Sequence, residues 1–464
     1  MAKITHLDLE ISSTCQASCS ACARNQSGVT VIDPTSHKLK EVQRAFKSIS
    51  KDLKTITFCG NIGDSMGNKD IALICRWFIM RNPDILINIH TNGGLGSPDT
   101  YRELATLGVR IIFGLDGLED TNHYHRAGVK WSNVVKNLEA YQSGFANKIK
   151  CRWTEEFNDD DDNGEYKMGI IQMILWQHNQ HQILDMARFA QTHKCSLWFR
   201  KAVITKDQNA NNGMPVFTPK GQYVCNLHEP DAIFDPISGY EFPCPDTWHP
   251  DNDIETKVTE FMDNACTELG INIHKWKRIL DNPILPDTEN APENVNDWSK
   301  HVPVRWMHDK RQEQYNVKYT DEQLDRFSIP VACKSMNWNN PVNIQDKEAD
   351  KELFIGADSY VSPCCMIGSA LSLHLQNALD DDDNSEPNLL KKDIANRIEA
   401  IGIDKFNSKL HSMQEIYESG VLHQLVFDNI EDNDARKGRQ PFCAAHCGTR
   451  GSYGRPIKDD RDNG

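Results

Sequence analysis

Three cysteines near the start of the chain, Cys15, Cys19 and Cys22, have the spacing C-x3-C-x2-C. A structural zinc site takes four ligands, commonly two C-x2-C pairs or one such pair with two histidines, and the nearest histidine here is His6. A redox pair needs only C-x-x-C and leaves Cys15 without a function. Three thiolates suit a four-iron cluster in which one iron lacks a protein ligand and stays open to another molecule.

Length, charge and cysteine content narrow the class of protein. The 464 residues exceed the usual size of one compact domain, which predicts two domains or a large one with a smaller one. The net charge of −15 disfavours nucleic acid as a partner, because an acidic surface repels phosphates. The N-terminus lacks the apolar region of a signal peptide, and no apolar run reaches membrane length, so we expect a cytoplasmic protein without a membrane partner. Fifteen cysteines in such a chain indicate metal binding or catalysis and not a disulfide framework.

The first two hundred residues alternate β-rich and helical segments, which predicts βαβ units and a largely parallel sheet. Six to seven such units are too few for a closed eight-fold barrel and enough for an incomplete one. The expected strands are 6–11, 55–60, 85–91, 109–116, 148–154, 169–175 and 196–203, and the expected helices are 38–50, 68–81, 98–107, 131–145 and 181–193.

After about residue 205 the alternation fades. Residues 254–281 have a helical pattern, and 282–305 are rich in Pro and Asn, as in a linker. Two acidic runs, 158–165 and 379–387, are interpreted as solvated loops, since neither has the glycine turn and spaced ligands of a calcium loop. We expect a barrel in 1–205, an irregular insertion in 206–330 and a second cysteine-bearing domain in 331–464.

The cysteine loop after a first strand resembles the signature of the radical S-adenosylmethionine superfamily. The resemblance implies an α/β fold with a partial (β/α)6 TIM-like barrel. It implies a [4Fe-4S] cluster whose unique iron is chelated by the amino and carboxylate groups of S-adenosylmethionine. The reduced cluster then cleaves that cofactor to a 5′-deoxyadenosyl radical, which abstracts hydrogen from the substrate. The family usually has an aromatic residue before the third cysteine, where this chain has Ala21.

The segment FCGNIGDS (58–65) at the end of the second strand resembles the Gly-Gly-Glu-type segment that contacts the methionine end of the cofactor in this family. Gly60 and Gly63 permit close backbone approach, and Asn61 and Asp64 offer acceptors for an ammonium group. An ordinary strand-to-helix turn favours the same residue types.

Two further strand ends, HTNGG (90–94) and GLDGLEDTNHYHRAG (114–128), also resemble the family, in particular members with extra iron–sulfur clusters. The ends of parallel strands are where such folds place their chemistry, and an arginine there suits a bidentate contact with a carboxylate. A solvated loop is the alternative for His123, His125 and Arg126. The cofactor-binding residues that the resemblance implies here are Asn92, Asp116 and Arg126.

The segment ILWQHNQHQI (174–183) fits the exit of the fifth barrel strand, where the family commonly has a polar side chain that holds the ribose hydroxyls. The resemblance favours Asn179 for this role, with His178 and Gln177 as alternatives. A helix N-cap is an equally good explanation of Asn179.

Cysteines gather again toward the C-terminus, in PVACKS, IGADSYVSPCC (355–365) and FCAAHCGTRG (442–451). The arrangement resembles the auxiliary-cluster extension called SPASM, or its shorter twitch form, and implies one auxiliary [4Fe-4S] cluster. A hairpin turn at Asp358 and Ser359 is expected from the residue types alone. Four cysteines on a structural zinc are the alternative. The implied ligands are Cys333, Cys364 or Cys365, Cys443 and Cys447.

Taken together, the resemblance implies a radical S-adenosylmethionine enzyme that oxidises or otherwise modifies a peptide, a protein or a small molecule. A one-electron reductant such as flavodoxin or ferredoxin would serve it. The alternative is a non-catalytic iron–sulfur or zinc-binding protein of electron transfer or scaffolding. Nucleic-acid modification needs a basic face that no Lys/Arg cluster in the sequence provides.

Overall fold

The fold is built on a nine-stranded sheet in the order β10-β7-β6-β5-β4-β3-β1-β12-β13. Its central six strands are neighbours in chain order and all run parallel. They are β1 (Ile4–Leu9), β3 (Thr55–Phe58), β4 (Leu86–Thr91), β5 (Arg110–Gly114), β6 (Gly169–Leu175) and β7 (Cys195–Lys201). The computed structural model describes residues 4–22, 24, 29–31, 34–60, 62–144, 169–202, 204, 213–220, 222–244, 253–286, 288, 302–304, 315–328, 351–356, 358–363, 367–368, 384–426, 441 and 443.

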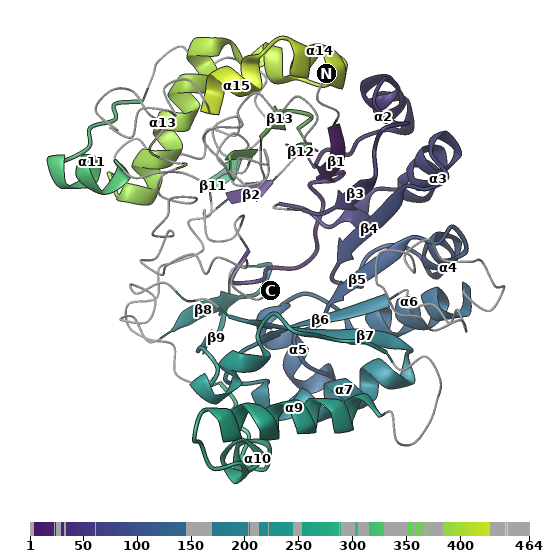
Figure 1. The fold of residues 1–464 in the computed structure, drawn as a ribbon, viewed down its shortest axis with the longest axis vertical. Coiled ribbons are helices and arrows are strands. Elements are labelled where there is room, and N and C mark those ends of the chain that lie inside the picture. Colours follow the sequence, from purple (N-terminus) through teal and green to yellow (C-terminus); the bar gives the residue numbers. More distant parts are fainter. Residues whose placement is uncertain are drawn as a thin grey trace.

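Helices connect the central strands and cover the convex side of the sheet, as Figure 1 shows. They are α2 (Leu39–Phe46), α3 (Ile71–Arg81), α4 (Pro98–Thr106), α6 (Trp131–Gly144) and α7 (Ile183–Thr192). Each begins near its predicted start; α4, for example, has Pro98 in its first turn and a Ser97 side chain that caps Thr100 N. The predicted α/β class with six strands of a partial TIM-like barrel is confirmed, and the described strands do not close into a barrel.

Strands from later in the chain extend both edges of the sheet. β10 (Glu241–Phe242) pairs antiparallel with β7, β12 (Lys351–Ile355) pairs parallel with β1, and β13 (Val361–Ser362) returns antiparallel to β12. This last pair confirms the hairpin expected at Asp358 and Ser359, and Ser359 has a positive φ of 76°. The sheet thus takes strands from all three predicted segments, and the division of the chain into domains stays a prediction.

A separate hairpin of β8 (Met214–Phe217) and β9 (Tyr223–Leu227) stands over the carboxyl ends of β6 and β7. Met214, Val216, Cys225 and Leu227 bury one face of it against Trp176, Ala202 and Ile204. The predicted irregular insertion therefore contains an ordered hairpin next to the barrel.

The helical pattern over 254–281 corresponds to two helices. The structure has α9 (Ile254–Glu268) and α10 (His274–Leu280), because Gly270 with a φ of 65° ends the first helix in a left-handed turn. The remaining elements are β2 (Val29–Val31) paired with β11 (Val302–Val304), α5 (Glu119–His125), α11 (Asp321–Phe327), α13 (Glu386–Ile401), α14 (Met413–Glu418), α15 (Val421–Val426) and short 3-10 turns η1 (Ser65–Gly67), η4 (Gln180–Gln182), η5 (Ala232–Ile237) and η8 (Ile403–Phe406). The strand expected at 148–154 lies outside the described residues.

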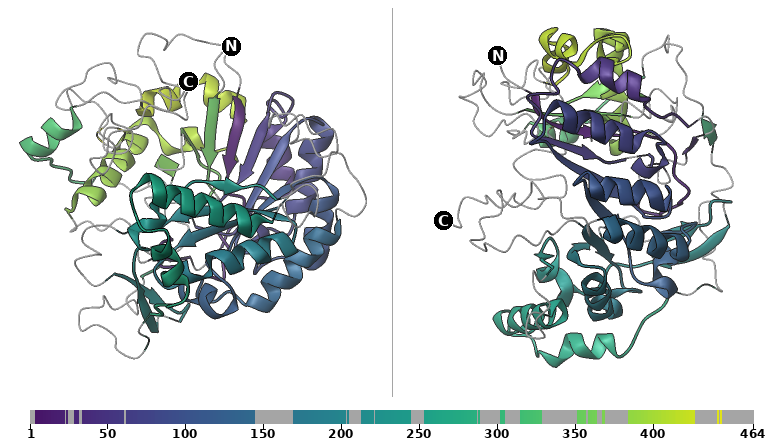
Figure 2. Two further views of the ribbon diagram at one scale, coloured as in Figure 1. Left: turned by 60° about the horizontal axis from the view of Figure 1, so that its bottom comes forward. Right: turned by 90° about the vertical axis from the view of Figure 1, so that its right-hand side faces the viewer.

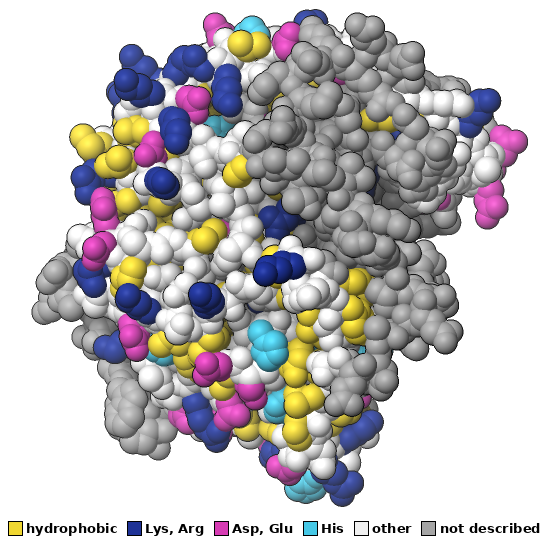
Figure 3. Space-filling view, turned by 180° about the vertical axis from the view of Figure 1, so that it is seen from behind, with side chains coloured by type: hydrophobic (Ala, Val, Ile, Leu, Met, Phe, Trp, Pro, Cys, Tyr) yellow, Lys and Arg dark blue, Asp and Glu magenta, His cyan; other side chains and the backbone are white. Residues whose placement is uncertain are grey.

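The helices α13 to α15 lie at the end of the molecule that holds β1 and β12 (Figure 2). On the face seen from behind the view of Figure 1, acidic side chains lie among the basic ones (Figure 3), so this face is not a uniformly basic surface. None of the described helices combines the length and the apolar character that crossing a membrane requires.

The packing of α4 against α6 generates a test of the core. Leu104 of α4 is fully buried, whereas Leu73 of α3 is 45% exposed. We expect Leu104→Ala to lower the free energy of unfolding by about 2–5 kcal/mol, since it leaves a cavity, and Leu73→Ala to change it by less than about 0.5 kcal/mol. Urea denaturation measures both values. Equal effects of the two variants would contradict this packing.

Candidate functional site

A cavity of about 410 Å³ lies at the carboxyl ends of the central strands. It collects residues from loops that are far apart in the sequence, as expected where parallel strands end together. Of the predicted site residues, it is lined by Cys15, Cys19, Cys22, Gly60, Gly63, Asp64, Asn92 and Arg126.

The cysteine loop directly follows β1 and is anchored at its middle. Ser18 N donates to Ala127 O at 2.8 Å, and Ser18 Oγ donates to Phe217 O of β8 at 2.6 Å. A turn with a Cys22 N to Cys19 O bond of 3.1 Å brings the second and third cysteines to the same cavity. The β8–β9 hairpin therefore holds the loop from one side.

The three thiols suit an iron–sulfur cluster better than a single ion. Burial, followed by the nearby Asp64, raises the pKa of Cys15 to about 11, and burial raises the pKa of Cys19 to about 12. Thiols with such pKa values need a bound cation to become thiolates. Within the part of the chain that the structure describes, no three His, Cys, Asp or Glu side chains are gathered for one metal ion. A four-iron cluster is larger than an ion and takes its thiolates from a wider ring, so the donor set fits it.

The Gly60–Gly63 segment lies against the cysteine loop at backbone contact. A Cβ at Gly63 would come within 1.9 Å of Ser12 O, so only glycine fits there. The carboxylate of Glu10, at the end of β1, accepts hydrogen bonds from Ile62 N at 2.6 Å and Gly63 N at 2.9 Å. Glu10 was not among the predicted site residues. Its place at the end of a strand, just before the cysteines, could have indicated a role at the site. Asn61 lies outside the described residues.

Asp64 connects the cysteine loop to the end of β4. Its backbone N donates to Thr14 O at 2.8 Å. Its carboxylate accepts from the Thr91 hydroxyl at 2.8 Å, from Asn92 N at 2.8 Å and from Met66 N at 2.9 Å. Burial raises its pKa, while these hydrogen bonds oppose the rise. The carboxylate is thus fixed in position at the cavity wall.

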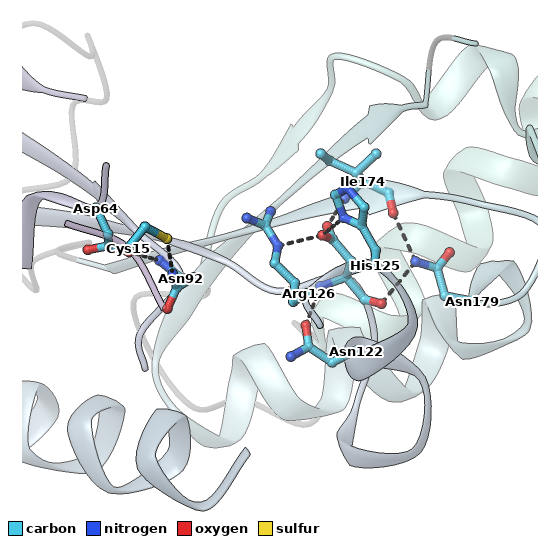
Figure 4. A network of polar contacts seen from close by, with 9 residues as sticks. Cys15, Asp64, Asn92, Asn122, His125, Arg126, Ile174 and Asn179 are labelled. Atoms are coloured by element: carbon cyan, nitrogen blue, oxygen red, sulfur yellow. Dashed lines mark hydrogen bonds and ion pairs between the residues drawn. The ribbon is translucent and has the colours of Figure 1, made fainter. Parts of the chain in front are cut away.

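Asn92 reaches back to the first cysteine. Its Nδ2 lies 3.6 Å from Cys15 Sγ, and its Oδ1 accepts from Gln16 Nε2 and from Gly94 N at 2.8 Å each (Figure 4). A donor at this distance from a thiolate tunes the charge on the sulfur.

Asp116 is the buried centre of a second network at the end of β5. Oδ2 lies 2.5 Å from His125 Nδ1 and 2.6 Å from Arg126 Nε, and Oδ1 accepts from Ile174 N at 2.8 Å. Burial alone would raise the pKa of Asp116, but Arg126 and His125 lower it well below its usual value. The side chain is therefore an ionised anchor for two cationic or polar groups.

The helix α5 presents His125 and Arg126 to the cavity. Asn122 within this helix accepts from Asp116 N at 2.9 Å (Figure 4). The ionised Asp116 accepts a hydrogen bond from Nδ1 of His125. The other ring nitrogen, Nε2, is buried and has no hydrogen-bond partner among the described residues. Both histidines lie in α5, a helix that the sequence did not predict. His123 is exposed to solvent, whereas His125 is 2% exposed, so a solvated loop is wrong for His125.

Asn179 is fully buried and does not line the cavity. Its Oδ1 accepts from Trp176 N at 2.8 Å, and its Nδ2 donates to Asp116 O at 3.0 Å and Ile174 O at 2.9 Å. On β6 the cavity is instead lined by Gln172 and Ile174, which the sequence analysis did not single out. Position 172 was recognisable as the one polar residue in an apolar strand.

Of the second cysteine set, the structure places one member. Cys443 is 7% exposed and belongs to the hydrophobic core. Cys333, Cys364, Cys365 and Cys447 lie outside the described residues. The auxiliary-cluster ligand set stays a prediction.

The Asp116 network generates a stability test. Asp116→Asn leaves the half-buried Arg126 without its counter-charge, and we expect a loss of roughly 2–4 kcal/mol in unfolding free energy at pH 7. Because folding lowers the pKa of Asp116, its contribution is present above the unfolded pKa of about 4 and disappears as the pH falls below it. The difference between wild type and variant, followed by urea denaturation, should shrink in that range.

The control is Asp185→Asn on α7, whose partner Arg188 is 59% exposed. Such surface pairs contribute about 0–1 kcal/mol, so this variant should behave as wild type at each pH. A gap between wild type and Asp116→Asn that does not change with pH would contradict the role of the ionised carboxylate.

Comparison with known proteins adds to this geometry. Residues 9–150 match the family described as the Radical SAM superfamily. No curated protein matches the chain. Among solved structures, it is similar to Streptococcus suis SuiB bound to S-adenosylmethionine, with 12% identity and a TM-score of 0.41 over 79% of this chain and 61% of SuiB. It is also similar to anSMEcpe with bound AdoMet and Cp18Cys peptide, with 12% identity and a TM-score of 0.39 over 98% and 91% of the two chains.

The chain spans about three fifths of the length of SuiB. Both structural similarities are distant, and the sequence match covers the barrel from the end of β1 to beyond α6. It includes the cysteine loop, the Gly60–Asp64 segment and the Asp116 network. Residues 9–150 are therefore identified as a radical SAM domain by this family match.

Proposed function

We propose that this protein is a radical S-adenosylmethionine enzyme that abstracts hydrogen from a substrate held in the barrel cavity. The observation that carries the proposal is that Cys15, Cys19 and Cys22 share one cavity with fixed polar groups of three other strand ends. When bound there, a [4Fe-4S] cluster with S-adenosylmethionine supplies the 5′-deoxyadenosyl radical. The chain itself binds and orients the reactants and excludes water.

The methionine end of the cofactor would meet the first two strand ends. Gly60 and Gly63 line the cavity and permit close packing of the backbone at its wall, and Asp64 provides a carboxylate whose oxygens are held by backbone donors. Asn92 would hold both the cysteine loop and the cofactor. Asn61 has the residue type for the same role.

Arg126 is suited to a carboxylate. Its Nε is bound to Asp116, while its terminal nitrogens lie over Gly114, where a Cβ would come within 2.7 Å of Nη2. This leaves a guanidinium edge for a bidentate contact within the cavity. Asn179 is a positioning residue in this proposal. Its Nδ2 donates to Asp116 O, so it would act on the cofactor only through the Asp116 network.

The finer functional assignments belong to the same proposal. They comprise a peptide, protein or small-molecule substrate, oxidoreductase or related modifying chemistry, flavodoxin or ferredoxin as reductant, and an auxiliary [4Fe-4S] cluster at Cys333, Cys364 or Cys365, Cys443 and Cys447. A cytoplasmic location belongs to the same proposal, because clustered cysteines with metal-binding spacing are typical of a reducing compartment.

The first test is anaerobic reconstitution followed by assay of the reduced protein for 5′-deoxyadenosine. We expect the wild type to form it and Cys19→Ala to form none and to bind less iron, because the cluster loses a ligand. Cys75→Ala is the control, since Cys75 is buried in α3 and does not line the cavity. A cluster-loaded wild type that forms no 5′-deoxyadenosine favours the non-catalytic alternative.

The second test concerns the auxiliary cluster. We expect Cys443→Ala to lower the iron content from about eight to about four atoms per chain while 5′-deoxyadenosine is still formed without coupling to substrate. Iron analysis and the same assay measure this. An unchanged iron content would remove Cys443 from the ligand set, and zinc in place of the lost iron would favour the structural-zinc reading.

A further inference from the structure

The concave face of the sheet is polar below the cavity. Asp8, Thr57, Asn88 and Arg110 are half-buried and stand in register on four neighbouring strands. They share a face with the cavity-lining His90 and Ile112, which lie two residues further along β4 and β5. Parallel strands that are packed on both faces are nearly continuous in apolar residues. This face is therefore built to meet polar groups.

Arg200 stands at the cavity end of the same face. It is in register with Ile174, and Trp198, two residues earlier, is in register with Gln172. Gln172 and Ile174 both line the cavity. Because register partners on parallel strands point to the same side, Trp198 and the exposed Arg200 lie next to these two lining residues on the β7 side, and neither is itself among the residues that line the cavity.

The guanidinium of Arg200 is held in place by an aromatic ring. It lies 4.8 Å from the ring centroid of Trp198, whose Nε1 donates to Gly239 O at 3.3 Å. Contact with the ring orders the long side chain. The N–H groups lie in the plane of the guanidinium and stay available to another partner.

No carboxylate among the described residues forms an ion pair with Arg200. The other arginines of this face differ: Arg110 pairs with Glu241 at 3.2 Å, and Arg126 pairs with Asp116. Glu241 belongs to β10, where it is in register with Trp198, and it is paired with Arg110.

The charge of Arg200 reaches the cavity. Burial, followed by the positive charge of Arg200, lowers the pKa of His90 to about 4. His90 is therefore neutral near pH 7 and adds no positive charge to the cavity.

We propose that Arg200, stacked on Trp198, binds an oxyanion of the substrate, a carboxylate or a phosphoryl group, and so orients the substrate in the cavity. The inference rests on the proposed function, because it takes the cavity as the substrate site. A preordered guanidinium beside a polar wall binds such groups in bidentate fashion. Carboxylates and phosphoryl groups share this chemistry.

The test uses cluster-loaded protein saturated with S-adenosylmethionine and without reductant, so that the carboxylate site of the cofactor is filled. Benzoate and inorganic phosphate are the probes, measured by isothermal titration calorimetry. We expect one equivalent of at least one anion to bind and Arg200→Gln to weaken it at least about tenfold, as loss of a charged hydrogen bond does. Tighter binding of benzoate identifies a carboxylate substrate, and tighter binding of phosphate a phosphoryl substrate.

Arg200→Lys should bind with intermediate affinity, because it keeps the charge and loses the stacked fork. Arg188→Gln on the convex helix α7 is the matched control and should bind as wild type. The inference is overturned if neither anion binds the wild type below about 100 mM, or if Arg200→Gln binds as tightly as wild type.

Formation of 5′-deoxyadenosine by the same preparations separates the two proposals. If wild type and Arg200→Gln both form it while anion binding is absent or unchanged, the Arg200 inference alone fails. If the loaded wild type forms none, the proposed function fails. Thermal melting of each variant shows whether a loss of binding reflects a loss of fold.

Discussion

A single buried carboxylate, Asp116, orients most of the polar groups on the β5–β6 side of the cavity. It joins the end of β5 to β6 through Ile174 N and to α5 through His125 and Arg126. An uncompensated charge in such a place is costly, so the two partners on α5 must stay where they are. The direction of the Arg126 guanidinium into the cavity follows from this pairing and from the absence of a side chain at Gly114.

The opposite side of the cavity is held by backbone contact. Gly63 touches Ser12, Glu10 binds two successive N–H groups of the 62–63 segment, and Asp64 binds Thr91 and the backbone of Asn92. Three loops from β1, β3 and β4 therefore form one rigid frame around the cysteines. Such preorganisation holds the groups around the cavity in fixed positions, which the proposed function requires, because reacting atoms must be placed before they react.

Local pattern predicted much of this arrangement. The apolar run 169–175 coincides with β6, and the cysteine loop, Asp64 and Asp116 follow strands whose order fixes where they meet. Pairing between distant segments could not be predicted from local pattern, and β12 pairs with β1 across more than three hundred residues. The burial of the His125 side chain likewise depends on its contact with Asp116. Asn179 shows the same limit, since its type suits both a ligand and the backbone groups it actually binds.

The distribution of charge connects the two sides of the cavity. At the cysteine side, burial raises the pKa of Cys15, Cys19 and Asp64, so these acidic groups favour a bound cation. At the β5–β7 side, Asp116 neutralises Arg126 and Glu241 neutralises Arg110, while Arg200 keeps its charge among the described residues. Arg200 is held against an aromatic ring and forms no ion pair with the acids of the described residues, so its field favours an anionic group on this side of the cavity. The cavity is thus polarised along its length, which would fix the direction in which a substrate with an acidic group enters.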